Sequence, residues 1–208
     1  MAHEHVGRLT YDHINCCVIV AHPDDETLWA GGTLLMHPDS CWTVVSLCRR
    51  DDPDRAPRFH QVVERYGAKG VMGNLDDGPE QKPLRTVAVE DAIMELLPSD
   101  RYDLVLTHGL WGEYTSHRRH EEVAKAVLAL RESGQLSADE LWMFAYEDGG
   151  KRYLPRPMAD ADVHIRLPQD IWEEKYRLIH EGYGFDADSF EAKTTPKEEA
   201  FWVLGKSK

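Results

Sequence analysis

Short apolar runs alternate along this chain with longer segments in which apolar residues recur every three or four positions. The short runs are rich in β-branched residues and predict strands, whereas the periodic segments predict helices. The predicted strands cover residues 16–21, 42–48, 102–107, 140–147, 161–167 and 200–205, with a short extended piece at 71–72. The predicted helices cover residues 26–37, 57–69, 86–97, 117–133 and 168–184.

This alternation indicates βαβ units, in which parallel strands carry helices on both faces of the sheet. We therefore expect an α/β protein, a Rossmann-like three-layer αβα sandwich with a mostly parallel sheet. No composition shift marks a linker, so residues 1–208 are expected to form a single domain. Right-handed crossovers bring the carboxyl ends of the strands to one edge, where ligands of such sheets bind.

Two polar motifs follow predicted strands and should emerge at this edge. AHPDDE follows the first strand, and THGLWGEYTSHRRH follows the end of the strand at 102–107. Within them, His22 and Asp25 lie three residues apart, and so do His117 and His120. Two imidazoles, a carboxylate and a water form a common ligand set of catalytic zinc.

A spare carboxylate lies beside this candidate ligand set. Asp24 directly precedes Asp25, and a metal-bound water needs a base that accepts its proton. Each motif also has a structural explanation, because Asp24 or Asp25 could cap the following helix. His117 and His120 could likewise be exposed residues at a helix start. Each motif alone favours its structural explanation. Because both motifs are expected at one sheet edge, a metal site is about as well supported as the structural explanations.

The motifs carry a resemblance to a known family. AHPDDE, then GGTLL inside the first helix, then THGLWGEYTSHRRH resemble the PIG-L/LmbE-like family of zinc-dependent N-deacetylases. The similarity spans about residues 16–130, with AHPDDE the most specific part. Members of this family remove N-acetyl groups from glucosamine-containing molecules, among them glycosylphosphatidylinositol precursors, thiol cofactor precursors, chito-oligosaccharides and antibiotic glycoconjugates.

The resemblance implies a role for each residue of the two motifs. His22, Asp25 and His120 would bind the metal. Asp24 would be the general base and would later pass its proton to the leaving amine. His117 would stabilise the oxyanion or act as an acid.

One position departs from the family pattern. The family often has His-Pro-Asp-His, whereas Arg119 stands here in the place of the inner Asp. A guanidinium cannot accept a hydrogen bond. If the family's Asp tunes the first histidine, its loss destabilises the imidazolium of His117, or another carboxylate such as Glu113 or Glu121 replaces it.

Several residues are candidates for substrate binding. Four arginines follow the second strand and could grip an anion or sugar hydroxyls, although nearby aspartates also fit a solvated loop. Arg58 is favoured because the family carries a substrate-contacting Arg where this helix opens. Trp111 could stack on a sugar or pack in its loop, Tyr114 could assist the oxyanion, and Asp77 could bind sugar hydroxyls or simply form a turn.

Composition narrows the class of partner. The chain has a formal net charge of −13, which repels phosphate backbones and anionic lipids, so no nucleic-acid and no membrane partner is expected. The N-terminal segment shows no signal-peptide pattern. All four cysteines lie in or beside strand-like runs and are expected to be reduced core thiols of a cytoplasmic protein. They are Cys16, Cys17, Cys41 and Cys48.

The expected function is that of a zinc-dependent hydrolase. It would remove an N-acetyl group from a GlcNAc-containing small molecule or glycoconjugate and release acetate. Fe²⁺ or another divalent metal would suit the ligands almost as well as Zn²⁺. An amidase acting on a thiol conjugate or another non-sugar amide, and a non-catalytic metal-containing carbohydrate-binding protein, are the alternatives. The sequence does not decide whether the chain forms a homo-oligomer.

Overall fold

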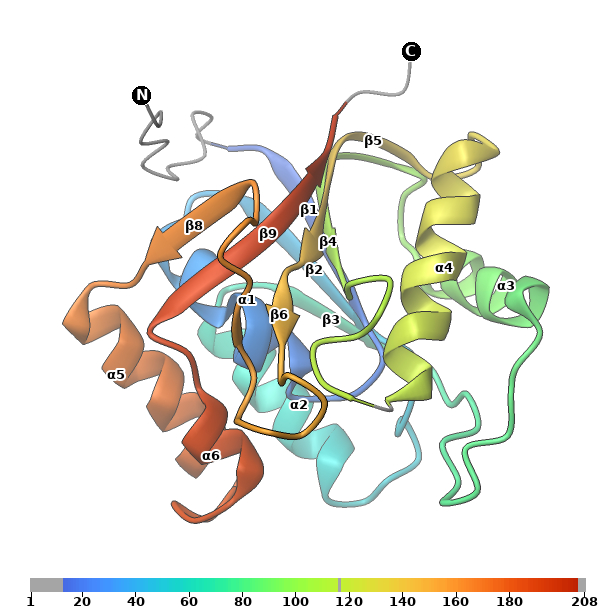
Figure 1. Cartoon of the computed structure of the whole chain (residues 1–208). Coiled ribbons are helices and arrows are strands. Elements are labelled where there is room, and N and C mark those ends of the chain that lie inside the picture. Colours follow the sequence, from blue (N-terminus) through green and yellow to red (C-terminus); the bar gives the residue numbers. More distant parts are fainter. Residues whose placement is uncertain (1–12, 116, 206–208) are drawn as a thin grey trace.

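The computed structural model describes residues 13–115 and 117–205 and is built around a seven-stranded sheet (Figure 1). The strand order is β3-β2-β1-β4-β5-β9-β8. Its strands are β1 (Asn15–Val20), β2 (Cys41–Ser46), β3 (Lys69–Met72), β4 (Arg101–Thr107), β5 (Ser137–Phe144), β8 (Val163–Arg166) and β9 (Glu198–Leu204). The first five are parallel, whereas β9 runs antiparallel to β5 and to β8. The predicted mostly parallel sheet is therefore confirmed.

Helices cover both faces of the sheet, as the sequence predicts. They are α1 (Asp25–Met36), α2 (Arg55–Arg65), α3 (Thr86–Leu96), α4 (Arg118–Glu132), α5 (Gln169–Arg177), the π-helix η1 (Leu178–Gly182) and α6 (Phe190–Thr194). Alternate residues of β1 point to opposite faces, so Val18 packs with α1 and α2, and Ile19 packs with α3 and α4. The two resulting cores give the Rossmann-like three-layer arrangement.

The C-terminal third differs in detail from its predicted elements. The strand predicted to reach residue 147 ends at Phe144, and a separate ribbon follows that pairs β6 (Tyr146–Glu147) with β7 (Arg156–Pro157). The helix predicted over 168–184 changes from α-helix to π-helix at Leu178. After this wider turn, the Tyr183 hydroxyl donates a hydrogen bond of 2.5 Å to Glu26, next to the AHPDDE turn.

The strand order reverses direction on either side of β1. The chain moves from β1 to β2 and β3 on one side, and then crosses to β4 on the other. In the parallel register Ile19 lies opposite Thr107, so β1 and β4 end side by side. The loops after these two strands therefore diverge from a topological switch point, where open α/β sheets bind ligands.

A buried ion pair fixes helix α1, which carries the end of the AHPDDE motif. Glu199 on β9 accepts hydrogen bonds from the backbone nitrogens of Gly32 (2.7 Å) and Thr33 (2.8 Å). It also accepts from Lys175 Nζ at 2.7 Å, and both charged side chains are fully buried. A Cβ on Gly32 would come within 2.3 Å of Leu167, which explains why a glycine stands in the middle of this helix.

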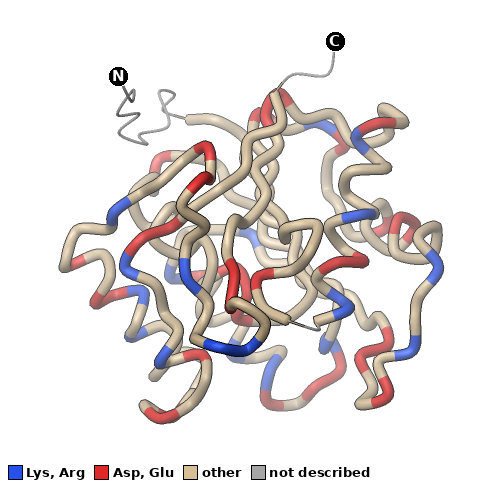
Figure 2. The backbone as a smooth tube through the Cα atoms, viewed as in Figure 1, with Lys and Arg blue, Asp and Glu red and all other residues tan. Residues whose placement is uncertain are grey.

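The chain carries more acidic than basic residues, with a formal net charge of −13. Figure 2 shows Lys and Arg interspersed with Asp and Glu around the molecule. Among the described residues, no helix combines the length and apolar composition needed to cross a bilayer.

The prediction of four core thiols is wrong for one cysteine. All four are free; Cys16, Cys17 and Cys48 are buried, but Cys41 is exposed at the start of β2. A strand's first residue lies at the open rim of the sheet, which the apolar pattern of the whole run does not reveal. Burial raises the pKa of the Cys16 and Cys48 thiols to about 12, so these two are protonated at neutral pH.

We expect Lys175→Met to lower the free energy of unfolding by about 3–5 kcal/mol, because it leaves the Glu199 carboxylate buried without its cation. Urea denaturation would measure the loss. The matched control is Lys125→Met, since Lys125 pairs with Glu121 on the surface and should change stability by less than about 0.5 kcal/mol. Equal losses in the two variants would show that the buried pair is not a constraint on α1.

Candidate metal and active site

The AHPDDE motif makes a sharp turn between β1 and α1. Asp24 has a positive φ of 112°, which is unusual for a residue with a side chain. Its N–H donates to the buried Glu26 carboxylate at 3.1 Å, while the His22 N–H donates to Asp25 at 2.9 Å. Asp24 makes no side-chain capping bond to the helix. The turn thus directs His22 and Asp25 together and leaves the Asp24 carboxylate free of a capping role.

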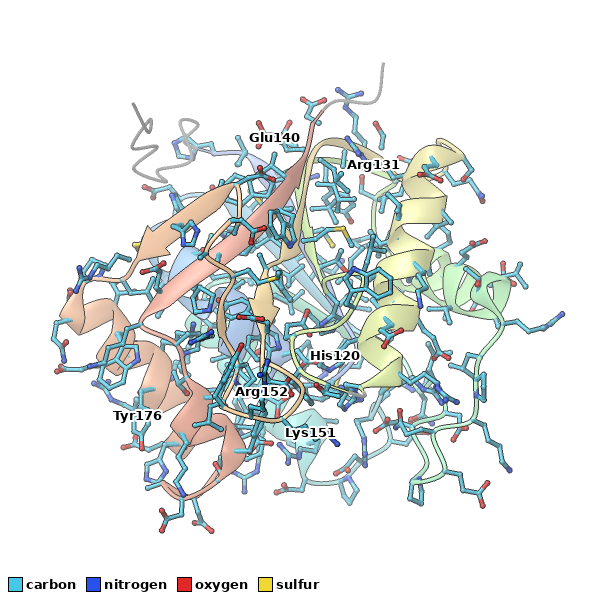
Figure 3. The ribbon with its side chains drawn as sticks, viewed as in Figure 1. His120, Arg131, Glu140, Lys151, Arg152 and Tyr176 are labelled. Atoms are coloured by element: carbon cyan, nitrogen blue, oxygen red, sulfur yellow. The ribbon has the colours of Figure 1, made fainter. Side chains whose placement is uncertain are left out.

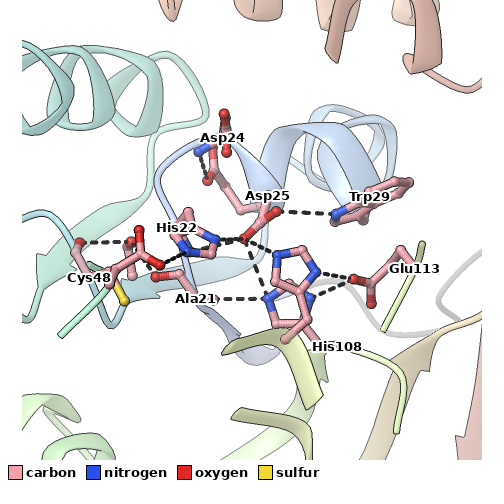
Figure 4. A network of polar contacts seen from close by, with 12 residues as sticks. Ala21, His22, Asp24, Asp25, Trp29, Cys48, His108 and Glu113 are labelled. Carbon is pink, nitrogen blue, oxygen red and sulfur yellow. Dashed lines mark hydrogen bonds and ion pairs between the residues drawn. The ribbon is translucent and has the colours of Figure 1, made fainter. Parts of the chain in front are cut away.

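Asp25 is the centre of the cluster (Figure 4). Its Oδ2 lies 3.2 Å from His22 Nδ1, 3.3 Å from His120 Nε2 and 3.5 Å from His108 Nε2. Its Oδ1 accepts from the Trp29 indole at 3.3 Å. Burial by itself raises the pKa of Asp25, but the imidazoles of His120 and His108 outweigh it and hold the pKa well below its usual range. Asp25 is therefore a carboxylate at neutral pH.

Glu113 orients two of the histidines. Its Oε2 lies 2.5 Å from His120 Nδ1 and 2.9 Å from His108 Nδ1, and both rings are fully buried. An ionised carboxylate only accepts hydrogen bonds, so both Nδ1 atoms carry hydrogen. The Ala21 N–H lies 2.9 Å from His108 Nε2. Burial lowers the pKa of His108, but Glu113 and Asp25 outweigh it and raise the pKa to about 9. The neutral ring accepts from Ala21 and the protonated ring turns an N–H to Asp25, so neither form has a lone pair left for a metal.

His120 presents the opposite situation. Its Nδ1 hydrogen bonds to Glu113, so Nε2, which faces Asp25, is the nitrogen left to bind a metal. Burial lowers the pKa of His120, but Asp25 and Glu113 outweigh it and raise the pKa, so a metal ion would bind Nε2 in exchange for a proton. That nitrogen is buried and has no hydrogen-bond partner among the described residues. A histidine that donates one ring N–H to a carboxylate and presents its other nitrogen to further candidate ligands has the usual geometry of a metal ligand. Figure 3 shows His120 at the start of α4, on the side turned toward the middle of the molecule.

His22 has a similar supporting carboxylate. Its Nδ1 faces Asp25, and its Nε2 lies 3.2 Å from Asp77 Oδ1. Asp77 is itself held by Arg49 at 2.6 Å and by Gln81 at 2.7 Å. Burial raises the pKa of Asp77, but its contacts with His22, Gln81 and Arg49 are stronger and lower the pKa overall. Asp77, predicted as a ligand of sugar hydroxyls, therefore also supports His22.

His117 lies beside these rings, and its buried Nδ1 has no hydrogen-bond partner among the described residues. Its ring centroid is 4.0 Å from that of His120 and 4.7 Å from that of His22. Burial, together with the charges of His120 and His22, lowers the pKa of His117 to about 3, so the ring is neutral at physiological pH. Of the two alternatives for the loss of the family's Asp, the substitute carboxylate is the one that the contacts contradict, because Glu113 contacts His120 and His108, and Glu121 pairs with Lys125.

Two overlapping groups among the described residues could hold a metal ion: His22, His117 and His120, and Asp25, His108 and His120. His108 is excluded because neither form of its ring has a lone pair left for a metal. Asp25 Oδ2 lies 3.2 Å from His22 Nδ1 and 3.3 Å from His120 Nε2, and His22, His117 and His120 each place one ring nitrogen within 4.8 Å of the others. This donor set fits Zn²⁺ or Fe²⁺, which bind imidazole and carboxylate together.

A cavity of about 630 Å³ adjoins the cluster. Its wall includes His22, Asp24, Asp25, Asp77, Tyr114 and His117, together with Arg49, Arg55, Gln81, Phe190 and Glu191. Two predicted substrate residues are not part of this wall. Trp111 is 84% exposed, and Arg58 donates to Asp54 at 2.8 Å.

Arg55 takes the place on the cavity that the sequence favoured for Arg58. It lies one helical turn earlier, with its Nη1 3.6 Å from Asp24 Oδ2 and its guanidinium over the Phe185 ring. That Nη1 is buried and makes no hydrogen bond to the described residues. Which of two arginines three positions apart faces the cavity depends on where the helix starts, and sequence fixes such boundaries only to a few residues.

His108, Phe190 and Glu191 were not singled out from the sequence. His108 directly follows β4, so its place at the strand end was the one available signal. Phe190 and Glu191 arrive from α6, far along the chain, and nothing local in their sequence marks them.

Comparisons with known proteins agree with this geometry. A family profile described as GlcNAc-PI de-N-acetylase (PIG-L) matches residues 17–131, more than half of the 208 residues. The chain belongs to the PIG-L family. An uncharacterized protein of Acanthamoeba polyphaga mimivirus is 22% identical over 81% of this chain and 75% of its own length. PIG-L membership confirms the resemblance seen in the motifs and assigns the chain to a deacetylase family.

Solved structures show the same fold at low identity. The teicoplanin deacetylase Orf2 in a zinc-inhibited form is 13% identical, with a TM-score of 0.65 over 91% of this chain and 97% of that one. A triple mutant of a deacetylase in teicoplanin biosynthesis is 16% identical, with a TM-score of 0.67 over 91% and 98%. GalB, the 4-carboxy-2-hydroxymuconate hydratase of Pseudomonas putida, is 16% identical, with a TM-score of 0.63 over 93% and 98%.

We expect Glu113→Gln to weaken zinc binding by about 10- to 100-fold. The carboxylate accepts from both Nδ1 atoms through Oε2 and from the Gly109 N–H through Oε1, whereas an amide has one acceptor oxygen and would set its NH₂ group against one of these donors. Titration of metal-free protein against a zinc chelator would measure this. Glu121→Gln is the matched control, since Glu121 lies in the first turn of α4 beside His120 but pairs with Lys125 on the surface. If both variants bind zinc as the parent does, the support of His120 by Glu113 has no part in metal binding.

Proposed function

We propose that this chain is a zinc-dependent amide hydrolase that removes an N-acetyl group from a glucosamine-containing small molecule or glycoconjugate and releases acetate. The observation that carries the proposal is the buried Nε2 of His120 beside Asp25 and His22, with the Asp24 carboxylate next to it on a cavity wall. Membership of a GlcNAc-PI de-N-acetylase family supports the amide and sugar parts of the proposal. The structural similarity to a teicoplanin deacetylase supports a glycoconjugate as the class of substrate.

His22, Asp25 and His120 would hold the metal. A bound zinc ion supplies two effects, since it lowers the pKa of a water toward about 7 and polarises an amide carbonyl. We assign the water's proton to Asp24. Burial and the neighbouring charge of Asp25 raise the pKa of Asp24 well above its usual range, partly offset by Arg55. A carboxyl group in such surroundings can both accept and release a proton near neutral pH.

The remaining steps use the same side chains. Water oxygen attacks the acetyl carbon as Asp24 takes its proton, and the carbonyl oxygen becomes an oxyanion. Neutral His117 would donate a hydrogen bond to that oxygen, with the Tyr114 hydroxyl on the same cavity wall. The C–N bond then breaks and Asp24 returns its proton to the amine nitrogen. Because the pKa of His117 is lowered to about 3, its ring is neutral and offers one N–H as a hydrogen-bond donor, which fits the oxyanion role rather than the acid role.

Asp24→Asn should lower kcat by about 10²- to 10⁴-fold, the usual contribution of a general base. Asn tolerates a positive φ, so the turn at residue 24 should survive the change. Zinc content of the purified variant, measured by metal analysis, should equal that of the parent. The control is Asp54→Asn, which alters an exposed carboxylate that precedes α2 and pairs with Arg58. A near-parental rate in Asp24→Asn would remove Asp24 as the base.

We expect Arg55→Met to lower kcat/KM by about 10-fold or more, because it removes a cation 3.6 Å from Asp24 whose buried Nη1 makes no hydrogen bond to the described residues. Arg58→Met should stay within about two-fold of the parent, as expected for an exposed ion pair. Steady-state kinetics on one acetylated substrate would compare them. The reverse order of effects would return the substrate-contacting role to Arg58.

The reaction itself is tested by acetate release. Metal-free protein reloaded with Zn²⁺ or Fe²⁺ is offered N-acetylglucosamine compounds that are free, phosphorylated, thiol-conjugated, lipid-linked or oligomeric, and in parallel simple non-sugar acetamides. Zinc-dependent release from a sugar compound supports the proposal. Release only from non-sugar amides moves the function to a general amidase. The panel also includes 4-carboxy-2-hydroxymuconate, because a hydratase acting on this compound shares the fold. Conversion of this compound, with no acetate released from any acetylated one, would overturn the proposal of a hydrolase.

A further inference from the structure

Arg119 is buried at the position where the family pattern has an aspartate, and its side chain points away from the histidines of the candidate metal site. Its side chain is 1% exposed. Its Nε donates to the Asp76 carbonyl at 2.6 Å and its Nη2 to the Lys82 carbonyl at 2.9 Å. Its Nη1 donates to Glu122 at 2.5 Å. One guanidinium therefore connects both ends of the segment 76–82 to the first turn of α4.

The same turn holds this segment at two further points. Arg118 donates to the Gln81 carbonyl at 2.7 Å, and Glu122 accepts from the Leu84 N–H at 3.0 Å. Residues 73–85 contain no helix or strand, so no regular ladder fixes their backbone. The position of residues 76–84, which we call the stapled segment, therefore depends on side chains of α4 to a large extent.

The stapled segment forms part of the active-site wall. Asp77, Gly78, Pro79 and Gln81 all line the cavity. Asp77 reaches His22 Nε2 at 3.2 Å, and Gln81 Nε2 donates to Asp77 at 2.7 Å. His120 lies next to Arg119 on α4. Arg119 consequently links the element that carries His120 with the segment that supports His22.

Arginine suits this task because its planar fork presents several donors in a fixed geometry. A lysine at this position has a single ammonium group and could not reach two carbonyls on opposite sides of the segment. An aspartate, the residue of the family pattern, has no hydrogen to donate to a carbonyl.

We infer that Arg119 is a positioning residue that staples segment 76–84 to α4 and so sets His22, through Asp77, at the right distance from His120 for metal binding. The inference rests on the proposed metal site. It goes beyond the ligand set because it assigns the spacing between two ligands to a residue that touches neither of them through its side chain. It also makes the stapled segment a fixed wall of the cavity, one that shapes which substrates enter.

The test compares Arg119→Lys with Arg177→Lys, a change at an exposed ion pair on α5. Two readouts need no substrate: amide hydrogen exchange of residues 76–84 and the zinc affinity of metal-free protein. We expect Arg119→Lys to speed exchange in the stapled segment and to weaken zinc binding by about 10-fold, the lower range for loss of support to a ligand. Arg177→Lys should leave both unchanged.

A second variant separates the steps. Asp77→Asn should weaken zinc binding to a similar extent while segment exchange stays slow, because the staple remains. In the double variant the two losses of zinc affinity should not add, since both act through the contact of Asp77 with His22. Fully additive losses, or parental zinc affinity in Arg119→Lys, would overturn the inference.

If Arg119→Lys does not fold, Glu122→Gln carries the same readouts, since it weakens both the Arg119 and the Leu84 contacts. Parental exchange and parental zinc affinity in that variant would overturn the inference. The outcome is distinct from that of the proposed function, because failure to release acetate from any compound leaves both readouts intact.

Discussion

The structure depends on how carboxylates are buried at the ends of β1 and β4. Asp25, Glu26 and Glu113 are each less than 5% exposed, and Asp24 lies beside them. Ionised groups in such a place are costly unless each finds a partner. Asp25 and Glu113 share the imidazoles of His108 and His120, whereas Glu26 accepts from Tyr183, Thr27 and the N–H of Asp24. The turn of AHPDDE and the buried loop after β4 are consequences of this pairing.

The pairing also determines which histidine nitrogen is free. Glu113 accepts a hydrogen bond from Nδ1 of His120, so Nε2 of that ring is the nitrogen without a hydrogen-bond partner among the described residues. In His108, by contrast, the Ala21 N–H contacts Nε2. Two stacked histidines with ring centroids 3.9 Å apart thereby have different chemistry. Neither outcome follows from the HxxH spacing, because both depend on Glu113 and on the Ala21 N–H in the turn after β1. The ligand motif thus supplies the atoms, and its surroundings decide how each atom is used.

The sequence was sufficient for the sheet, the order of the helices and the meeting of His22, Asp25, His117 and His120, because strand ends and three-residue spacings are local features. It was not sufficient for residues whose place depends on long-range contacts. Arg55 rather than Arg58 lines the cavity because the helix begins at residue 55, two residues before its predicted start. Asp77 was selected as a turn or a sugar ligand, yet its contact with His22 requires a loop that α4 holds in place.

The replacement of an aspartate by Arg119 shows why such surroundings can change while a ligand set persists. In the HxxH segment the third residue is turned away from the cluster, since His117 and His120 share the opposite side of the first helical turn. The supporting carboxylates of the ligands come from other parts of the chain, Glu113 before the helix and Asp77 from the segment before α3. A change at position 119 therefore removes no support from His120. It converts a position that could only accept hydrogen bonds into one that donates several, and the carbonyls of a neighbouring irregular segment are the acceptors within reach. In our inference, metal binding and loop position are coupled through one helical turn, although the candidate ligands match the family pattern.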